Sequence, residues 1–197
     1  MAQREQPAFA VWITGLPASG KSTVAAQLSR QLGDRGIDVE VLESDELRKI
    51  FSTQPRYDEQ DREYFYRSMA FIGRVLTDHG IAVIFDATAN LRRYRDQARQ
   101  QISQFIEVYI DSPLETCIQR DPKGIYLKGR KGEATSVPGL QAPYEPPQLP
   151  DVIIHGDRDN PTEAAGRIVQ TLISKGLVSP PGHACDKRGP QRARRTR

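Results

Sequence analysis

The stretch Phe9-Ala10-Val11-Trp12-Ile13-Thr14-Gly15-Leu16-Pro17-Ala18-Ser19-Gly20-Lys21-Ser22-Thr23 decides the fold of this chain. Its first six residues form an apolar run of strand length, and the residues that follow it place Val24, Leu28 and Leu32 at helical spacing. Between the two lies the pattern G-x-x-x-x-G-K-S, a phosphate-binding loop (P-loop) in the strand-to-helix context that the motif requires. The stretch therefore predicts an α/β protein that binds a nucleotide.

The residue types of this loop explain how it would hold phosphates. Gly15 and Gly20 permit backbone angles that aim successive N–H groups inward, and the helix that starts near Lys21 adds the positive end of its dipole. We expect Lys21 to reach the β- and γ-phosphates and the Ser22 hydroxyl to bind Mg²⁺. The predicted cofactors are therefore ATP and Mg²⁺. The residues predicted to hold the nucleotide are Gly15, Leu16, Pro17, Ala18, Ser19, Gly20, Lys21, Ser22 and Thr23.

Apolar runs alternate with amphipathic stretches along the rest of the chain, as a parallel α/β sheet requires. We expect strands at 9–14, 39–42, 81–85, 105–110 and 152–155, and helices at 22–32, 45–51, 62–79, 91–103 and 161–174. Gly80 is expected to end the third helix. The predicted fold class is thus a P-loop NTPase, with a five-stranded parallel sheet flanked by helices in one domain over residues 9–178.

The alternation lapses between Asp121 and Pro150, where glycine, proline and basic residues are frequent. A long irregular segment in a compact domain is typical of a functional lid, so we expect a lid at about residues 121–150. Residues 1–8 are predicted to form an N-terminal tail, and residues 179–197 a basic, disordered tail. A weak contact of this basic tail with nucleic acid stays open, and no other nucleic-acid partner is expected.

The composition is ordinary for a globular protein, with 38% hydrophobic and 27% charged residues and a formal net charge of +3. No apolar run approaches the roughly 20 residues that a membrane span needs, and the first residues lack a signal-peptide pattern. We therefore expect a cytoplasmic protein without a membrane partner. Its cysteines, Cys117 and Cys185, are expected to stay reduced. The sequence leaves the oligomeric state open, a homodimer included.

A P-loop alone does not distinguish a kinase from a GTPase or a motor. The chain is barely longer than a minimal domain, and no Asn-Lys-x-Asp motif, which reads guanine, follows a strand. The basic segment 123–131 stands where nucleoside-monophosphate-type kinases keep a closing lid, which excludes water during phosphoryl transfer. These features predict a kinase that acts on a small molecule.

Several separated stretches resemble the adenylylsulfate (APS) kinase family. The longest are Arg120-Asp121-Pro122-Lys123-Gly124-Ile125-Tyr126 and Pro143-Tyr144-Glu145-Pro146-Pro147, and the P-loop with its preceding Trp12 is also similar. Leu42-Glu43-Ser44-Asp45-Glu46-Leu47-Arg48 resembles the family motif L-D-G-D-x-[IVL]-R, and Asp61-Arg62 stands where the family has D-R-x-x-N-I-R. The resemblance covers roughly residues 9–175. It implies transfer of a phosphoryl group from ATP to the 3′-hydroxyl of APS, which gives 3′-phosphoadenylylsulfate in sulfate activation.

Asp45 follows the second predicted strand, at the carboxyl edge where open α/β sheets bind ligands. A carboxylate there can orient the acceptor hydroxyl and take its proton, or help to hold Mg²⁺, whereas the alternative is a plain helix N-cap. Arginines suit an anionic acceptor because guanidinium presents paired donors. The resemblance implies that Arg120 stacks on the ATP adenine. It also implies the catalytic residues Lys21, Asp45, Lys128 and Arg130 and the acceptor-binding residues Asp45, Arg48, Tyr57, Arg62, Phe65 and Arg92.

The acceptor side departs from the family pattern. Tyr57 can supply one aromatic face for the APS adenine, but Val137-Pro138-Gly139-Leu140 replaces the lid sequence F-T-G-I. Phe65 stands at the Asn of D-R-x-x-N-I-R. The run Asp86-Ala87-Thr88-Ala89-Asn90 replaces A-F-I-S-P, and its Ala89 takes the serine position. This run resembles P-loop kinases of other hydroxyls, in which an Asp lies near the Mg²⁺. Asp86 is therefore predicted as a metal ligand beside Ser22, with a strand-end cap as its alternative.

Two alternatives to an APS kinase follow from these departures. One is a kinase with the same scaffold that phosphorylates a different small-molecule or nucleotide hydroxyl. The other is a nucleotide-binding regulatory module without efficient transfer. The presence of Lys21, Asp45, Lys128 and Arg130 argues against the second alternative, since a binding module does not need cations in a lid.

Overall fold

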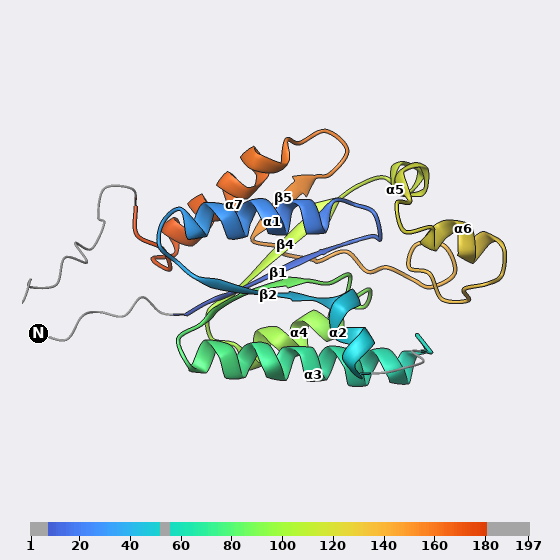
Figure 1. The fold of residues 1–197 in the computed structure, drawn as a ribbon, viewed down its shortest axis with the longest axis horizontal. Coiled ribbons are helices and arrows are strands. Elements are labelled where there is room, and N and C mark those ends of the chain that lie inside the picture. Colours follow the sequence, from blue (N-terminus) through green and yellow to red (C-terminus); the bar gives the residue numbers. More distant parts are fainter. Residues whose placement is uncertain (1–7, 52–55, 181–197) are drawn as a thin grey trace, which may run out of the picture.

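The computed structural model describes residues 8–51 and 56–180 and contains a five-stranded parallel sheet with strand order β2-β3-β1-β4-β5 (Figure 1). In chain order the strands are β1 (Ala10–Gly15), β2 (Val39–Glu43), β3 (Ala82–Asp86), β4 (Phe105–Asp111) and β5 (Val152–His155). Because β1 pairs with both β3 and β4, the P-loop that follows it lies in the middle of the carboxyl edge. The predicted fold class and its five parallel strands are confirmed.

Helices cover both faces of the sheet, with α1 packed on α7 on one face and α3 packed on α4 on the other (Figure 1). Figure 1 also shows α5 and α6 beyond the carboxyl edge of the sheet. In the described part of the chain the helices are α1 (Lys21–Gly33), α2 (Ser44–Phe51), α3 (Glu59–Asp78), α4 (Arg92–Gln101), α5 (Leu114–Arg120), α6 (Ile125–Arg130) and α7 (Pro161–Ser174). None of them is long and apolar enough to cross a membrane.

The central strand β1 is buried on both faces, as a strand inside a parallel sheet must be. Val11 and Ile13 face the core beneath α1 and α7, whereas Trp12 faces the core beneath α3 and α4. The Trp12 ring stacks on Phe85 of β3 with 4.5 Å between ring centroids, and its Nε1–H donates to the carbonyl of Ala87 at 3.1 Å. This packing fixes the ends of β1 and β3 relative to each other.

Helix α3 begins three residues earlier than the apolar spacing predicts. Asp58 is its N-cap, and the carboxylate accepts a hydrogen bond from the backbone N–H of Asp61 at 2.8 Å. At the other end Gly80 follows the C-cap His79 with a φ of 82°, so this helix ends where it was predicted to end. Because α3 starts earlier, Asp61 lies in its first turn, next to the residues of this helix that face the carboxyl edge of the sheet.

The segment predicted as irregular, 121–150, contains the short helix α6. Tyr126 of this helix is buried and donates its hydroxyl hydrogen to the carbonyl of Pro17 in the P-loop at 3.1 Å. Near the other end of the segment, the Tyr144 hydroxyl lies 3.1 Å from the Thr14 hydroxyl, and the Glu145 N–H donates to the carbonyl of Asn90 at 2.7 Å. The segment is therefore held at both ends against the carboxyl edge. Residues 1–7 and most of the predicted basic tail, with Cys185, lie outside the described residues.

A buried ion pair on the α4 side of the sheet gives a first prediction. Glu107 of β4 accepts from Arg95 at 2.7 Å and from Arg99 at 2.9 Å, and the Arg95 side chain is only 1% exposed. Replacing Glu107 by alanine leaves the buried charge of Arg95 without its carboxylate partner, so we expect the free energy of unfolding to fall by about 3–5 kcal/mol. Urea denaturation measures this change. Arg74→Ala, which breaks an exposed ion pair with Asp78, is the control and should cost less than about 1 kcal/mol.

Candidate active site

A cavity of about 1160 Å³ lies at the carboxyl edge of the sheet, between the P-loop and the lid segment. It brings together residues from β2, α2, the loop before α3, the end of β3, the last residue of α5 and helix α6. Most of the predicted site residues line it: Pro17, Ala18, Ser19, Gly20, Lys21, Ser22, Thr23, Asp45, Arg48, Tyr57, Arg62, Asp86, Arg120 and Lys128. The predicted residues Gly15, Leu16, Phe65, Arg92 and Arg130 do not line it.

The P-loop has the backbone conformation that its glycines were expected to provide. Gly20 has a φ of 108° and precedes the first residue of α1. At Gly15, a Cβ atom would lie 2.7 Å from the carbonyl oxygen of Ile110, so no larger residue fits between β1 and β4. Ser19 is buried, and its hydroxyl has no hydrogen-bond partner within the described residues. Such a loop at a helix N-terminus is suited to bind phosphate oxygens.

Lys21 places its ammonium group inside this loop. The Nζ atom donates to the carbonyls of Leu16 at 2.9 Å and Gly15 at 3.2 Å. Burial lowers the pKa of Lys21, while the nearby carboxylates of Asp86 and Asp45 act in the opposite direction. A buried cation whose hydrogen-bond partners are carbonyls gains from an incoming anion, because the anion offsets the cost of burial.

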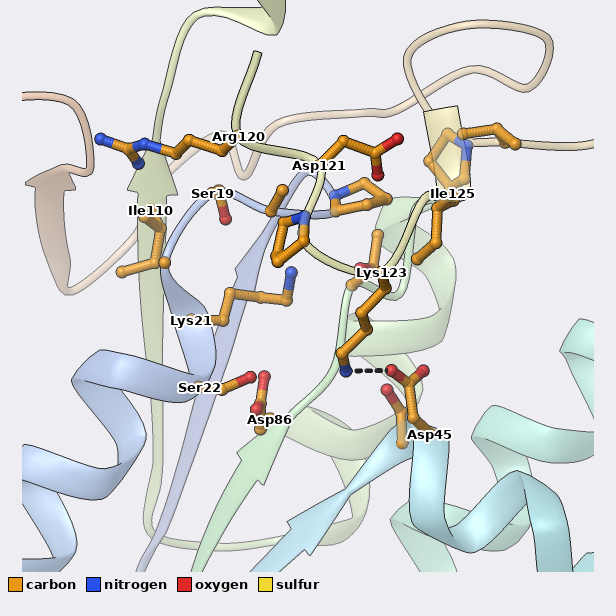
Figure 2. A pocket seen from close by; sticks show the side chains of 18 of the residues that line it. Ser19, Lys21, Ser22, Asp45, Asp86, Ile110, Arg120, Asp121, Lys123 and Ile125 are labelled. Carbon is orange, nitrogen blue, oxygen red and sulfur yellow. Dashed lines mark hydrogen bonds and ion pairs between the residues drawn. The ribbon is translucent and has the colours of Figure 1, made fainter. Parts of the chain in front are cut away.

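Ser22 and Asp86 form the candidate metal site. Figure 2 shows the Ser22 hydroxyl and the Asp86 carboxylate pointing toward each other below Lys21. Asp86 ends β3 and is only 5% exposed. The described residues hold no group of three or more His, Cys, Asp and Glu side chains able to cage a metal. One carboxylate and one hydroxyl nevertheless fit Mg²⁺, which keeps several waters and takes further ligands from substrate phosphates.

Asp45 lies across the cavity from the P-loop, where it pairs with a residue that the sequence analysis missed. Its Oδ2 atom accepts from the Lys123 Nζ at 2.6 Å, and Glu43 lies 3.7 Å from the same ammonium (Figure 2). The hydrogen bond to Asp45 raises the pKa of Lys123. Both side chains of the pair are about half exposed, at 54% and 48%, so the pair is weak enough to separate. The only signal in the sequence was a lysine inside the run R-D-P-K-G-x-Y.

Asp45 lies in the first turn of α2, which begins at Ser44. The alternative interpretation of Asp45 as a plain N-cap is therefore not supported, since the helix already includes the residue before it. Its carboxylate is directed toward Lys123 and the cavity, as Figure 2 shows.

The predicted acceptor arginines differ in how many partners they have. Arg48 is 6% exposed and pairs with Asp61 at 3.1 Å, and its guanidinium lies over the ring of Phe65. Arg62 is tied to three segments of the chain: it donates to the carbonyl of Tyr57 at 2.9 Å, to the Asn90 side chain at 2.9 Å and to the carbonyl of Ser136 at 2.6 Å. Burial lowers the pKa of Arg62.

Asn90 is a second residue that sequence reasoning missed. Its side chain accepts from Arg62 and donates to the carbonyl of Pro143 at 2.9 Å, so it joins the acceptor side to the end of the lid segment. The chemical signal was present, since an asparagine stood where the family pattern has a proline. Its partners are far away in the sequence and could not be deduced from it.

The remaining predicted residues lie around the rim of the cavity. Arg120 donates to the carbonyl of Gly156 at 2.8 Å, at the end near β5. Tyr57 has a φ of 58° and is 43% exposed on the acceptor side, where Val137 and Pro138 also line the cavity. Arg92 donates its backbone N–H to the Glu145 carboxylate at 2.8 Å. Arg130 is exposed on α6.

The cavity joins a phosphate-binding loop to an acidic residue and to arginines suited to an anionic acceptor, under a segment that carries Lys123 and Lys128. Donor and acceptor can thus occupy one enclosed space, as phosphoryl transfer requires. The chain is a P-loop kinase.

Comparisons with known proteins identify the family of kinases to which the chain is similar. The model of the family described as adenylylsulphate kinase matches residues 7–155. The adenylyl-sulfate kinase of Halothermothrix orenii is 37% identical over 90% of this chain and 96% of its own length. That of Synechococcus sp. (strain JA-3-3Ab) is 39% identical over 85% of this chain and 96% of its own. The solved structure of the Mycobacterium tuberculosis APS kinase in complex with AMPPNP and APS is similar at a TM-score of 0.79 and 36% identity, covering 84% of this chain and 98% of that chain.

The chain belongs to the adenylylsulphate kinase family. The resemblance expected from the sequence motifs is thereby confirmed, as are the predicted class of enzyme, a phosphotransferase, and the predicted adenylyl-sulfate kinase function. The similar M. tuberculosis enzyme was solved with AMPPNP, an ATP analogue, which agrees with ATP as the phosphoryl donor.

Proposed function

We propose that this chain phosphorylates the 3′-hydroxyl of APS with ATP and Mg²⁺, and that the predicted site residues that line the cavity carry out this reaction. The observation that supports the proposal best is the single cavity that is lined by Lys21 and Asp86 on the donor side and by Asp45 and Arg48 on the acceptor side. Membership in the adenylylsulphate kinase family supports the same acceptor.

The residues divide the work of the transfer between them. The backbone N–H groups of the P-loop and the Lys21 ammonium bind the β- and γ-phosphates and stabilise the charge that develops in the transition state. Ser22 and Asp86 would hold Mg²⁺, which supplies positive charge to the phosphate oxygens when bound. Asp45 accepts the proton of the 3′-hydroxyl as the new O3′–P bond forms and the bond between the γ-phosphorus and its bridging oxygen breaks. ADP is the leaving group.

The anionic end of the acceptor would lie against Arg48, because paired guanidinium donors match phosphate and sulfate oxygens. Closure of the lid segment brings Lys128 toward the transferring group. Because Asp45 is paired with Lys123 in this structure, that ion pair has to loosen before the carboxylate can take a proton from the acceptor.

The acceptor base has one aromatic wall rather than two. Tyr57 lines the cavity, but Val137 and Pro138, which also line it, stand where the family pattern has the lid phenylalanine and the threonine after it. Stacking on an aromatic side chain contributes about 1–3 kcal/mol per base, so we expect APS to bind about ten- to hundredfold more weakly than in relatives with a lid phenylalanine. Because APS is expected to bind more weakly, a related compound with a hydroxyl group is the alternative acceptor.

An assay of ADP release tests the proposed reaction. Purified protein receives ATP and Mg²⁺ with APS, or with members of a panel of nucleosides and simple alcohols. We expect ADP formation that depends on APS. Turnover with another acceptor and none with APS would contradict the proposal in favour of the same scaffold acting on a different hydroxyl. ATP binding without any turnover would favour a regulatory module.

The role of Asp86 can be tested through the metal requirement. Replacing Asp86 by asparagine keeps an oxygen ligand but removes its negative charge, so we expect the Mg²⁺ concentration for half-maximal activity to rise about tenfold or more. A titration of activity with Mg²⁺ measures this shift. Asp111→Asn is a matched control, since Asp111 ends strand β4 of the same sheet but does not line the cavity. An unchanged Mg²⁺ requirement in Asp86→Asn would mean that Asp86 does not bind the metal and only caps the end of β3.

A further inference from the structure

Arg48 is a buried cation whose guanidinium is only partly paired. Its Nη1 atom donates to the Asp61 carboxylate at 3.1 Å, but Nη2 has no hydrogen-bond partner among the residues that the structure describes. The side chain is 7% exposed and lines the acceptor side of the cavity. A buried donor without a partner costs about 1–3 kcal/mol. The side chain that carries this donor forms part of the cavity wall, where a bound anion can offset the cost.

Aromatic rings hold this guanidinium in place. Its Cζ atom lies 3.8 Å from the centroid of the Phe65 ring, closer than to the Tyr57 ring at 4.9 Å or the Tyr66 ring at 5.6 Å. A guanidinium that packs face-on against a ring keeps its N–H donors free along its edge. The contact with Phe65 therefore supports the Arg48 guanidinium without using up the donors that an acceptor needs.

The Phe65 ring is itself held by its neighbours. It is 3% exposed and makes edge contacts with Tyr66 at 5.2 Å and Phe51 at 6.0 Å between ring centroids. Phe65 does not line the cavity, so it cannot touch a bound acceptor directly in this conformation. Two of its contacts, Arg48 and Tyr66, do line the cavity, and of these only Arg48 carries a charge suited to an anionic acceptor.

We propose that Phe65 is a positioning residue for the acceptor: its ring holds the Arg48 guanidinium at the cavity wall, where it binds the anionic phosphosulfate end of APS. The family pattern has asparagine at this position, whose polar side chain could not offer such a platform. In this chain an aromatic support of the arginine thus takes the place of a polar group. The inference rests on the proposed function, since it concerns the same acceptor.

Replacing Phe65 by leucine tests the role of the ring. We expect the KM for APS to rise about tenfold, because the stack on a largely desolvated ring is lost, while kcat and the KM for ATP change less than about twofold. Phe71→Leu is the matched control. Phe71 lies on the same helix and also carries an arginine, Arg74, at 5.1 Å from its centroid, but it is exposed and outside the cavity lining. Its KM for APS should stay unchanged.

A double-mutant cycle shows whether Phe65 acts through Arg48. Lysine has no planar guanidinium to stack, so Arg48→Lys alone should raise the KM for APS, and adding Phe65→Leu to it should raise the KM little further. Additive effects of the two substitutions would overturn the proposal, because they would mean that Phe65 acts on the site by another route.

Thermal unfolding of each variant separates positioning from general stability. If Phe65→Leu fails to fold, Phe65→Met offers an unbranched side chain without a ring, and the same rise in KM is expected. An unchanged KM for APS in a folded variant that lacks the ring contradicts the role proposed for Phe65 and leaves the proposed function standing. An unmodified protein that releases no ADP with APS contradicts both this inference and the proposed function.

Discussion

Replacing Lys21 by alanine is expected to lower kcat by about three orders of magnitude, within the range that single charged stabilisers of phosphoryl transfer contribute. The ammonium group is buried in the P-loop and has only the carbonyls of Gly15 and Leu16 as hydrogen-bond partners among the described residues. It can therefore turn to the γ-phosphate oxygens without breaking an ion pair. Its charge is worth more there than in water because the site is desolvated.

Single-turnover measurement of ADP formation with saturating ATP and APS checks this expectation. ATP should still bind, because the backbone N–H groups of the P-loop remain. Lys175→Ala removes another lysine, one that pairs with Asp151 at 2.9 Å after the end of α7, and should leave the rate unchanged. A Lys21→Ala variant that kept more than about a tenth of the rate would contradict a role in stabilising the transition state.

Replacing Asp45 by asparagine is expected to lower kcat by about 10²- to 10⁴-fold, the usual contribution of a general base. The amide preserves the size of the side chain but cannot accept the proton of the acceptor hydroxyl. The KM for ATP should change little, since Asp45 pairs with Lys123 and, among the described residues, makes no hydrogen bond or ion pair with the P-loop.

Two controls separate the possible roles of this carboxylate. Glu43→Gln removes the other carboxylate near Lys123, at 3.7 Å, and should leave kcat within about twofold of the unmodified protein if only Asp45 is the base. Excess Mg²⁺ should not restore the Asp45→Asn variant. Full recovery at high Mg²⁺ would instead assign Asp45 to the metal, the other role that the sequence left open.

The elements of the sheet were predictable because each strand is a short segment rich in apolar residues next to a turn. The start of α3 was not, since it depends on the side-chain cap that Asp58 makes with Asp61 rather than on apolar spacing. Helix α6 was also missed, because its six residues include Gly129 and begin after Gly124, a composition typical of a loop.

The donor side of the site was predictable for a similar reason, since the P-loop is one contiguous motif whose local geometry determines its chemistry. The acceptor side is assembled from distant segments. Phe65 and Arg62 lie on the same face of α3, and only the packed structure shows that Arg62 reaches the cavity while Phe65 supports Arg48 from behind. The links from Lys123 to Asp45 and from Asn90 to Arg62 likewise join residues far apart in the chain.

The stacked indole between β1 and β3 has a practical consequence for all of these experiments. Trp12 is the single tryptophan of the chain, it is fully buried, and it lies on β1, the strand before the P-loop, in contact with the carbonyl of Ala87 just after Asp86. Selective excitation of its fluorescence therefore reports on one known place in the protein, without a label. Its emission distinguishes a variant that has lost a catalytic group from one that has lost its folded core.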